Sequence, residues 1–200
     1  MTLSRRTLLV LAGMSLGVPA VAWAHPGVAS AAAPHGGLFA GLLHPLLGWD
    51  HVLAMVTVGL WAAQIGRRAL WIVPTSFVVM MSAGASLGMG EAPLPFVESG
   101  ILTSLMVLGL VTALAWRVPI AAAAVGVGVF ALFHGHAHGS ELVGGMSGLG
   151  YGLGFSLTTA ALHATGIGLT LLLTRLRHAD WVRYAGATVC SIGLIAGIAA

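Results

Sequence analysis

The stretch ILTSLMVLGLVTALAWRVPIAAAAVGVGVFALFHGHAH, residues 101–138, is apolar on both sides of one arginine, Arg117. Each half is close to the roughly 20 residues that a helix needs to cross the hydrocarbon core of a bilayer. The arginine marks a turn at the membrane surface. The stretch therefore predicts two membrane-spanning helices, at 97–116 and 118–138, and the second ends in histidines.

The composition of the whole chain also indicates an integral membrane protein. Of its 200 residues, 58% are hydrophobic and 6% are charged, and the mean hydropathy is +1.00. A soluble domain carries about 25% charged residues. The 29 glycines suit helices that pack closely inside a bilayer. The chain has no lysine, which excludes a Walker A ATPase site, and its arginines suggest membrane orientation rather than nucleic-acid binding.

Four further apolar stretches have a similar length. With the two above they predict an all-α polytopic membrane protein with six transmembrane helices, at 39–63, 69–90, 97–116, 118–138, 147–173 and 180–199. The connections between them are short, so we expect residues 38–200 to form one domain.

The first 24 residues read as a cleavable signal peptide. Arg5 and Arg6 supply the positive start, an apolar run follows, and Ala22 to Ala24 form an A-x-A cleavage site. An uncleaved first helix is the alternative. Residues 25–37, rich in alanine, glycine and proline, are expected to form an extracytoplasmic tail.

The arginines predict the orientation of the spans. All of them fall at the start of the chain or in the alternate connections around Arg67, Arg117 and Arg175. The positive-inside rule makes that side cytoplasmic, so the mature N-terminus and the C-terminus should both be periplasmic at a bacterial inner membrane. Six spans also divide into two halves of opposite orientation, and this suggests a 3+3 inverted arrangement.

Ionisable side chains inside the spans point to function, because each costs roughly 2.5–3.5 kcal/mol at the bilayer centre. In HPLLGWDHVLAM, residues 44–55, His44 and His51 would lie about 10 Å apart along a straight helix. Either a kink at Pro45 and Gly48 brings them to one metal ion, or they serve successive sites. Asp50 is either a metal ligand itself or the acceptor of a hydrogen bond from the N–H group of a metal-binding imidazole. A helix cap and a structural polar pair are the non-functional alternative.

A second cluster ends the fourth predicted span in FHGHAHGSE, residues 133–141. His134, His138 and Glu141 are spaced at i, i+4 and i+7, so they share a helix face, whereas His136 points away from that face. The three histidines could instead be a metal-capturing strip beyond the helix end. Imidazoles and carboxylates together are ligands for divalent transition metals.

The predicted topology brings these two clusters together at the extracytoplasmic side. His163, in the fifth span, is either a deeper metal ligand or a hydrogen-bonding histidine between helices. His25 would become the N-terminal residue after cleavage, and its amine and imidazole could hold a metal weakly.

At these residues the chain resembles the HupE/UreJ family of nickel/cobalt permeases associated with hydrogenases and ureases. The resemblance rests on HPLLGWDHVLAMVTVGLWAA (44–63), FHGHAHGSE (133–141) and, more loosely, GFSLTTAALHATG (154–166). It implies that six residues are metal-associated: His44, Asp50, His51, His134, His138 and Glu141. His136 occupies a variable position of the motif.

The function that we expect is secondary import of Ni²⁺, with Co²⁺ close behind, without a prosthetic group or enzymatic activity. One alternative is an intramembrane zinc hydrolase, with Glu141 or Asp50 as base. Another is a metal-binding sensor or donor subunit. The sequence does not decide whether the chain forms a homo-oligomer. It also does not decide whether the metal is destined for a hydrogenase, a urease or a cobalt cofactor such as cobalamin.

Overall fold

The computed structural model describes residues 36–141 and 148–199. The predicted signal peptide and tail therefore lie almost wholly outside the described residues. The described part of the chain is all-helical, as predicted. Its helices are α2 (Gly36–Leu47), α3 (Trp49–Ile65), α4 (Ala69–Met89), α5 (Val97–Ala113), α6 (Ile120–Ser140), α7 (Gly148–Arg175) and α8 (Asp180–Ala199).

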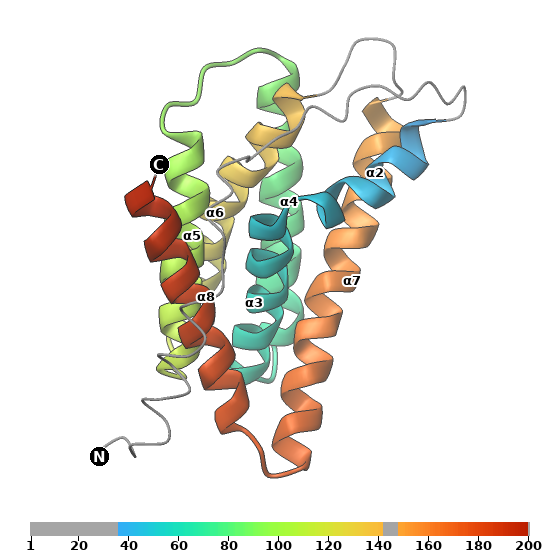
Figure 1. The fold of residues 1–200 in the computed structure, drawn as a ribbon. Helices are drawn as coiled ribbons and strands as arrows, with labels where there is room; N and C mark the ends of the chain where they lie inside the picture. The colour runs from blue at the N-terminus through green and yellow to red at the C-terminus, as the bar shows by residue number, and fades with distance from the viewer. Residues whose placement is uncertain (1–35, 142–147, 200) are drawn as a thin grey trace.

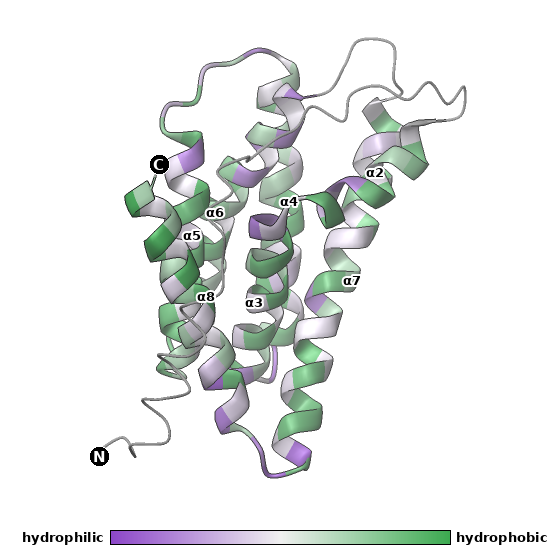
Figure 2. Cartoon of the chain, in the orientation of Figure 1, coloured by the Kyte–Doolittle hydropathy of each residue, from purple (hydrophilic) through white to green (hydrophobic). Residues whose placement is uncertain are grey.

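Each of the six predicted spans corresponds to helical structure. Four helices, α4, α6, α7 and α8, are long and apolar enough to cross a membrane, and α2 with α3 makes a fifth span if the bent pair counts as one. The remaining helix, α5, is apolar but shorter, with 17 residues. It ends at Ala113, and Ala115 then takes a left-handed conformation with φ of 48° before Pro119, which is the N-cap residue of α6. Figure 2 shows apolar residues along the whole bundle.

The first predicted span is broken. Its two helices, α2 and α3, meet at Gly48 with a bend of 85°, so α2 turns away from the axis that α3 follows through the bundle (Figure 1). Pro45 lies in the last turn of α2, and proline and glycine are common causes of such breaks. The kink at Pro45 and Gly48, one of the two alternatives that the sequence left open, is thus found in the structure.

The helices pack in three close pairs, and glycine is the reason. The bent pair α2–α3 packs along α7, α4 packs on α6, and α5 packs on α8. At Gly59 and Gly166 of the first pair, and at Gly84 and Gly135 of the second, an added Cβ would collide with the backbone of the partner helix. Without a Cβ the two backbones approach closely, which is how helices gain van der Waals contact in a bilayer.

The arginine-bearing turns, between α3 and α4, α5 and α6, and α7 and α8, lie at one end of the bundle. The connection between α4 and α5 lies at the opposite end (Figure 1). We call these the arginine end and the histidine end, because the start of α3 and the end of α6, which carry the histidine motifs, belong to the second.

Candidate metal site

The bend at Gly48 brings two separated histidines to the same neighbour. His44 precedes the break and His51 follows it, and their ring centroids lie 4.7 and 4.1 Å from that of His138 on α6. A Cβ at Gly48 would come within 2.9 Å of the His51 Nδ1 atom, so glycine leaves room for the ring beside the break. The kink is therefore present, but the compact group of possible metal-ligand atoms contains His44 and not His51.

The two motifs therefore meet, although they are far apart in the sequence. Beyond His138, the ring of His51 also lies 4.7 Å from that of His134. On the outer side, His44 Nε2 is 3.1 Å from Glu141 Oε2, and His138 Nδ1 is 3.9 Å from the same oxygen. We call this set the histidine row, and in order it comprises Glu141, His44, His138, His51 and His134.

Burial deepens along the histidine row. The side chains of His44 and Glu141 are 29% and 30% exposed. His138 is 3% exposed, and His51 and His134 are fully buried. The row thus begins at the surface of the histidine end and continues into the protein interior. Ions arriving from that side would meet Glu141 and His44 first.

The proton on His51 can be assigned from its neighbour. Asp50 Oδ1 lies 2.7 Å from His51 Nδ1 and also accepts the His51 backbone N–H at 2.8 Å. A carboxylate oxygen only accepts hydrogen bonds, so Nδ1 of His51 carries the ring proton and donates a hydrogen bond to Asp50. The lone pair of the imidazole is then on Nε2, which is buried without a hydrogen-bond partner among the described residues. A carboxylate behind an imidazole is the usual support of a metal-binding histidine.

His134 is oriented in the same way by a serine that the sequence analysis did not identify. Ser104 Oγ on α5 donates its proton to the Ile101 carbonyl oxygen at 2.6 Å. Ser104 Oγ also lies 2.9 Å from His134 Nε2. Because its own proton is already donated to Ile101, it accepts a hydrogen bond from the Nε2–H group of His134. The lone pair of His134 is left on Nδ1, which is also buried and unpaired within the described chain. One serine in an apolar helix gave no signal beyond its polarity.

His138 stands at the centre, and neither of its ring nitrogens has a hydrogen-bond partner within the described chain. Leaving a buried polar atom unsatisfied costs about 1–3 kcal/mol, and four such nitrogens gather on three neighbouring rings. The ligand atoms of His44, His138 and Glu141 also lie within 4.8 Å of one another, which is close enough for one metal ion. Unpaired imidazole nitrogens beside a carboxylate form a donor set that suits Ni²⁺ or Zn²⁺.

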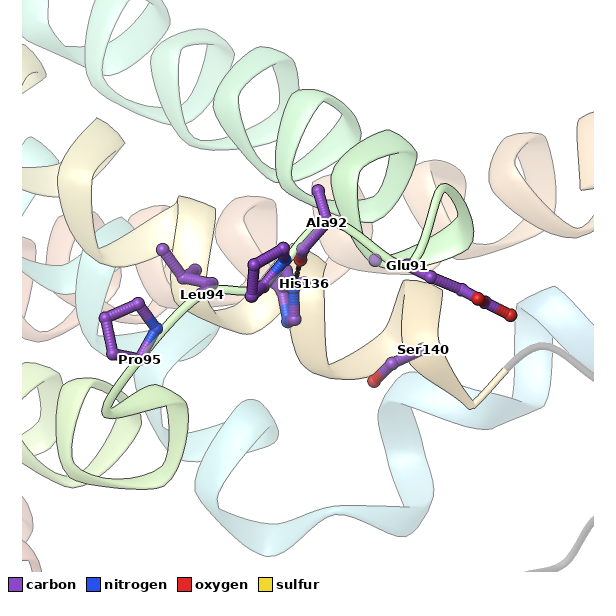
Figure 3. A pocket seen from close by; sticks show the side chains of 8 residues that line it. Glu91, Ala92, Leu94, Pro95, His136 and Ser140 are labelled. Carbon is purple, nitrogen blue, oxygen red and sulfur yellow. Dashed lines mark hydrogen bonds between the residues drawn. The ribbon is translucent and has the colours of Figure 1, made fainter.

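His136 lies on the opposite face of α6, as its spacing predicts. Its Nε2 is 2.8 Å from the Ala92 carbonyl oxygen in the loop between α4 and α5, and Figure 3 shows the ring against the 92–95 backbone. Glu91 and Phe96, at the two ends of this loop, have left-handed φ angles of 54° and 61°. His136 thus holds a tight loop in the structure and is separate from the histidine row.

His163 is buried, 1% exposed, and both of its ring nitrogens lack a partner in the described residues. Its ring packs edge-on against Phe77 of α4 at 5.0 Å, and Phe77 lies 5.8 Å from His134. The contact that links His163 to the histidine row is therefore an apolar phenyl ring. His25 lies outside the described residues.

Comparison with known proteins agrees with the geometry. The HupE / UreJ protein family model matches residues 12–196. The chain belongs to the HupE/UreJ family. It is 42% identical to Protein HupE of Rhizobium leguminosarum bv. viciae over 179 residues, which are 90% of this chain and 91% of that protein. No solved structure matches the chain.

The HupE/UreJ family is one of hydrogenase and urease accessory proteins associated with nickel and cobalt transport. The two motifs that carry the resemblance, at 44–63 and 133–141, are the two that build the histidine row. Aromatic side chains of α7 pack against the outer part of the histidine row. The ring centroid of Tyr151 lies 5.6 Å from that of His44, and the ring centroid of Phe155 lies 4.4 Å from that of His138. Both aromatic residues were missed from the sequence, where they read as ordinary apolar positions.

Replacing Asp50 with asparagine is expected to weaken nickel binding by about 10–100-fold, because an amide is a poorer acceptor for the Nδ1 proton of His51. Isothermal titration calorimetry of the detergent-solubilised protein with NiCl₂ measures the change in affinity. Asp180→Asn is the matched control, since Asp180 is exposed at the start of α8, 3.9 Å from Arg183. Equal affinities of the two variants would show that Asp50 does not support a metal-binding imidazole.

Proposed function

We propose that the protein imports Ni²⁺, with Co²⁺ as the second substrate, through the histidine row and across the bacterial inner membrane. The observation that carries the proposal is the continuous contact of four imidazoles from the partly exposed rim at His44 to the interior, with unpaired nitrogens, within the described chain, on the three buried rings. A structural polar cluster would pair these nitrogens with one another or with the backbone. A site that receives a cation leaves them free.

Transport would begin at the rim. Glu141 and His44 would replace part of the hydration shell of the ion, and His138 would complete the first site, since the three ligand atoms lie within 4.8 Å. His138 also contacts His51, so the ion could pass inward by exchanging Glu141 and His44 for His51 and His134 while it stays bound to His138. Each step would replace ligands rather than remove them, which keeps the barrier low.

Energy for accumulation need not come from ATP. Moving two positive charges inward across about 100 mV releases roughly 4.6 kcal/mol. That free energy corresponds to roughly a thousandfold concentration ratio. In the proposed orientation the arginine end faces the cytoplasm, so the histidine row opens to the periplasm and the membrane potential drives the ion inward.

The pairing of helices supports the 3+3 inverted arrangement as part of this proposal. With the bent pair α2–α3 counted as the first span, the first half consists of α2–α3, α4 and α5, and the second half of α6, α7 and α8. A twofold axis that exchanges the halves then relates α2–α3 to α6, α4 to α7, and α5 to α8. The close pair α3 and α7 would then map onto α6 and α4, and the pair α5 and α8 onto itself. These are the three close pairs in the structure. An experimental structure in which the two halves do not superpose about an axis in the membrane plane would remove this symmetry.

The test is uptake of radiolabelled nickel by proteoliposomes with an inside-negative potential. We expect accumulation that collapses with the potential, that an excess of cobalt inhibits strongly, and that magnesium leaves unchanged, because imidazole ligands prefer nickel and cobalt over magnesium. Protein-free liposomes are the control. Nickel binding without accumulation would contradict import and would support a sensor or donor subunit, which delivers metal to a hydrogenase, a urease or a cobalt cofactor pathway.

One observation favours the zinc hydrolase as a second candidate. Two histidines and a glutamate, the set His44, His138 and Glu141, form a compact group of the kind that holds catalytic zinc. That function requires one zinc ion that stays bound through purification. Metal analysis of protein purified without chelators separates the candidates, because stoichiometric, slowly exchanging zinc favours the hydrolase, whereas weakly held, exchangeable nickel favours import.

A further inference from the structure

The inner half of α3 carries buried polar groups that the histidine row does not use. Thr57 is 1% exposed, and Thr112 on the neighbouring helix α5 is fully buried. Their hydroxyl groups and the Gln64 Oε1 atom have no hydrogen-bond partner among the described residues.

On α3, Thr57 and Gln64 lie in line with Asp50. Asp50, Thr57 and Gln64 are seven residues apart in turn, so they lie on one face of the helix, with about 10 Å between successive residues along its axis. This face looks toward α5, because Gln64 Nε2 donates to the carbonyl oxygen of Thr112 on α5 at 3.0 Å. Nearby, Trp61 Nε1 donates to the carbonyl oxygen of Trp116, in the turn that follows α5, at 2.8 Å. The polar row on α3 thus starts beside His51 and ends at the arginine end.

Helix α5 supplies polar groups opposite this row. Ser104, in its outer half, is the hydroxyl that orients His134. Thr112 is eight residues further on, about 12 Å along the axis, and lies beside Gln64 through its carbonyl group. The interface between α3 and α5 is therefore polar at both ends, with the hydroxyl group of Thr57 on α3 between them.

The unpaired threonine hydroxyls are unusual within this protein. On the outer surfaces of the helices, Thr165 and Thr188 donate to the carbonyl oxygen four residues earlier in their own helix, at 2.9 and 3.0 Å. Thr57 and Thr112 are more deeply buried and make no such bond within the described chain. Buried hydroxyl groups without a protein partner call for water or an ion.

The other inward direction is closed by an apolar side chain. His163 is connected to the histidine row through the phenyl ring of Phe77, which is fully buried. A dication that moves from His134 toward His163 would have to pass that ring, whereas the α3–α5 interface offers oxygen atoms.

We propose that Thr57, Gln64 and Thr112 line a water-filled release route between α3 and α5, by which the cation leaves the histidine row toward the arginine end. This inference rests on the proposed import function. Hydroxyl and amide oxygens bind Ni²⁺ more weakly than imidazoles do. The ion would therefore exchange imidazoles for water along the route and be released at its end.

The route is tested first without any metal. In a Cys190→Ala background, which removes the sole cysteine, Thr57→Cys and Thr112→Cys are exposed to a charged methanethiosulfonate reagent from the arginine side. We expect both to react at least about tenfold faster than Val58→Cys, because only a hydrated thiol ionises and meets the reagent. Val58 is as deeply buried but lies on another face of α3. Equal rates at Thr57 and Val58 would overturn the route, whether or not the protein transports nickel.

Uptake then tests whether the ion uses the route. The double variant Thr57→Val/Thr112→Val is expected to slow the initial uptake of nickel by about tenfold while its nickel affinity stays unchanged. Thr57→Ser/Thr112→Ser keeps the hydroxyl groups and should restore the rate, and Thr165→Val/Thr188→Val is the matched control. Unchanged uptake in the valine variant would overturn the route, most directly if His163→Ala stops uptake instead. If the wild type takes up no nickel, the proposed import function is contradicted. The reaction rate of Thr57→Cys still shows whether water reaches the interface between α3 and α5.

Discussion

Nickel uptake is expected to fall by about a hundredfold or more when His51 is replaced by alanine. Changing only the outer-shell partner of a ligating histidine already costs about 10–100-fold. His51 is fully buried between His138 and His134, and its unpaired Nε2 faces no competing group in the described chain. Removing this ring breaks the continuity of the histidine row at its middle.

Alanine at this position also leaves Asp50 without its imidazole partner, so a second variant separates folding from function. In His51→Asn the side-chain amide can take the place of Nδ1 and donate to Asp50 Oδ1, but nothing replaces Nε2. We expect this variant to unfold at the temperature of the wild type and still to lose nickel uptake in proteoliposomes. His178→Ala, at an exposed position near the arginine end, is the control for loss of a histidine. Wild-type uptake by His51→Asn would show that His51 is not a ligand.

A second large effect is expected at the interface between α4 and α6. An added Cβ at Gly135 would overlap the carbonyl oxygen of Met81 on α4, and neither backbone can yield without moving the helix. Overpacking of this kind costs about 1–3 kcal/mol and occasionally more. Gly135 directly follows His134 in the chain, so separation of the helices displaces the histidine row. Gly135→Ala should therefore lower both the unfolding temperature in detergent and the nickel affinity.

The matched control lies on the same helix. An added Cβ at Gly126 would meet no atom within 4 Å, so Gly126→Ala should be neutral or should stabilise α6 by up to about 1 kcal/mol through helix propensity. Equal thermal stability of Gly126→Ala and Gly135→Ala would show that close backbone contact does not hold α4 against α6.

The helices and the meeting of the two histidine motifs could be predicted from the sequence, because both follow from hydropathy and the alternation of spans. The bend at Gly48 was predictable as a kink, since Pro45 and Gly48 interrupt an otherwise apolar span. Its angle of 85° was not, because it depends on how α2 packs along α7. The abundance of glycine indicated close packing but gave no information on which helices form pairs.

The details of the candidate site depend on contacts between distant segments, and these escaped the sequence analysis. Ser104 orients His134 from another helix, 30 residues away in the chain. Phe77 is one of many apolar residues in α4, and only the fold places it against both His134 and His163. The repeat of Asp50, Thr57 and Gln64 was visible in the sequence. Its meaning emerged only when α5 proved to be the helix that this face contacts.

Nickel K-edge X-ray absorption of the nickel-loaded protein in membranes tests the central claim most directly. If the buried imidazoles hold the transported ion, the wild type should show several imidazole ligands, and the double variant His51→Asn/His134→Ala should show fewer at the same occupancy. A spectrum of oxygen ligands alone in the wild type, or an identical spectrum in the double variant, would contradict binding of the metal in the histidine row.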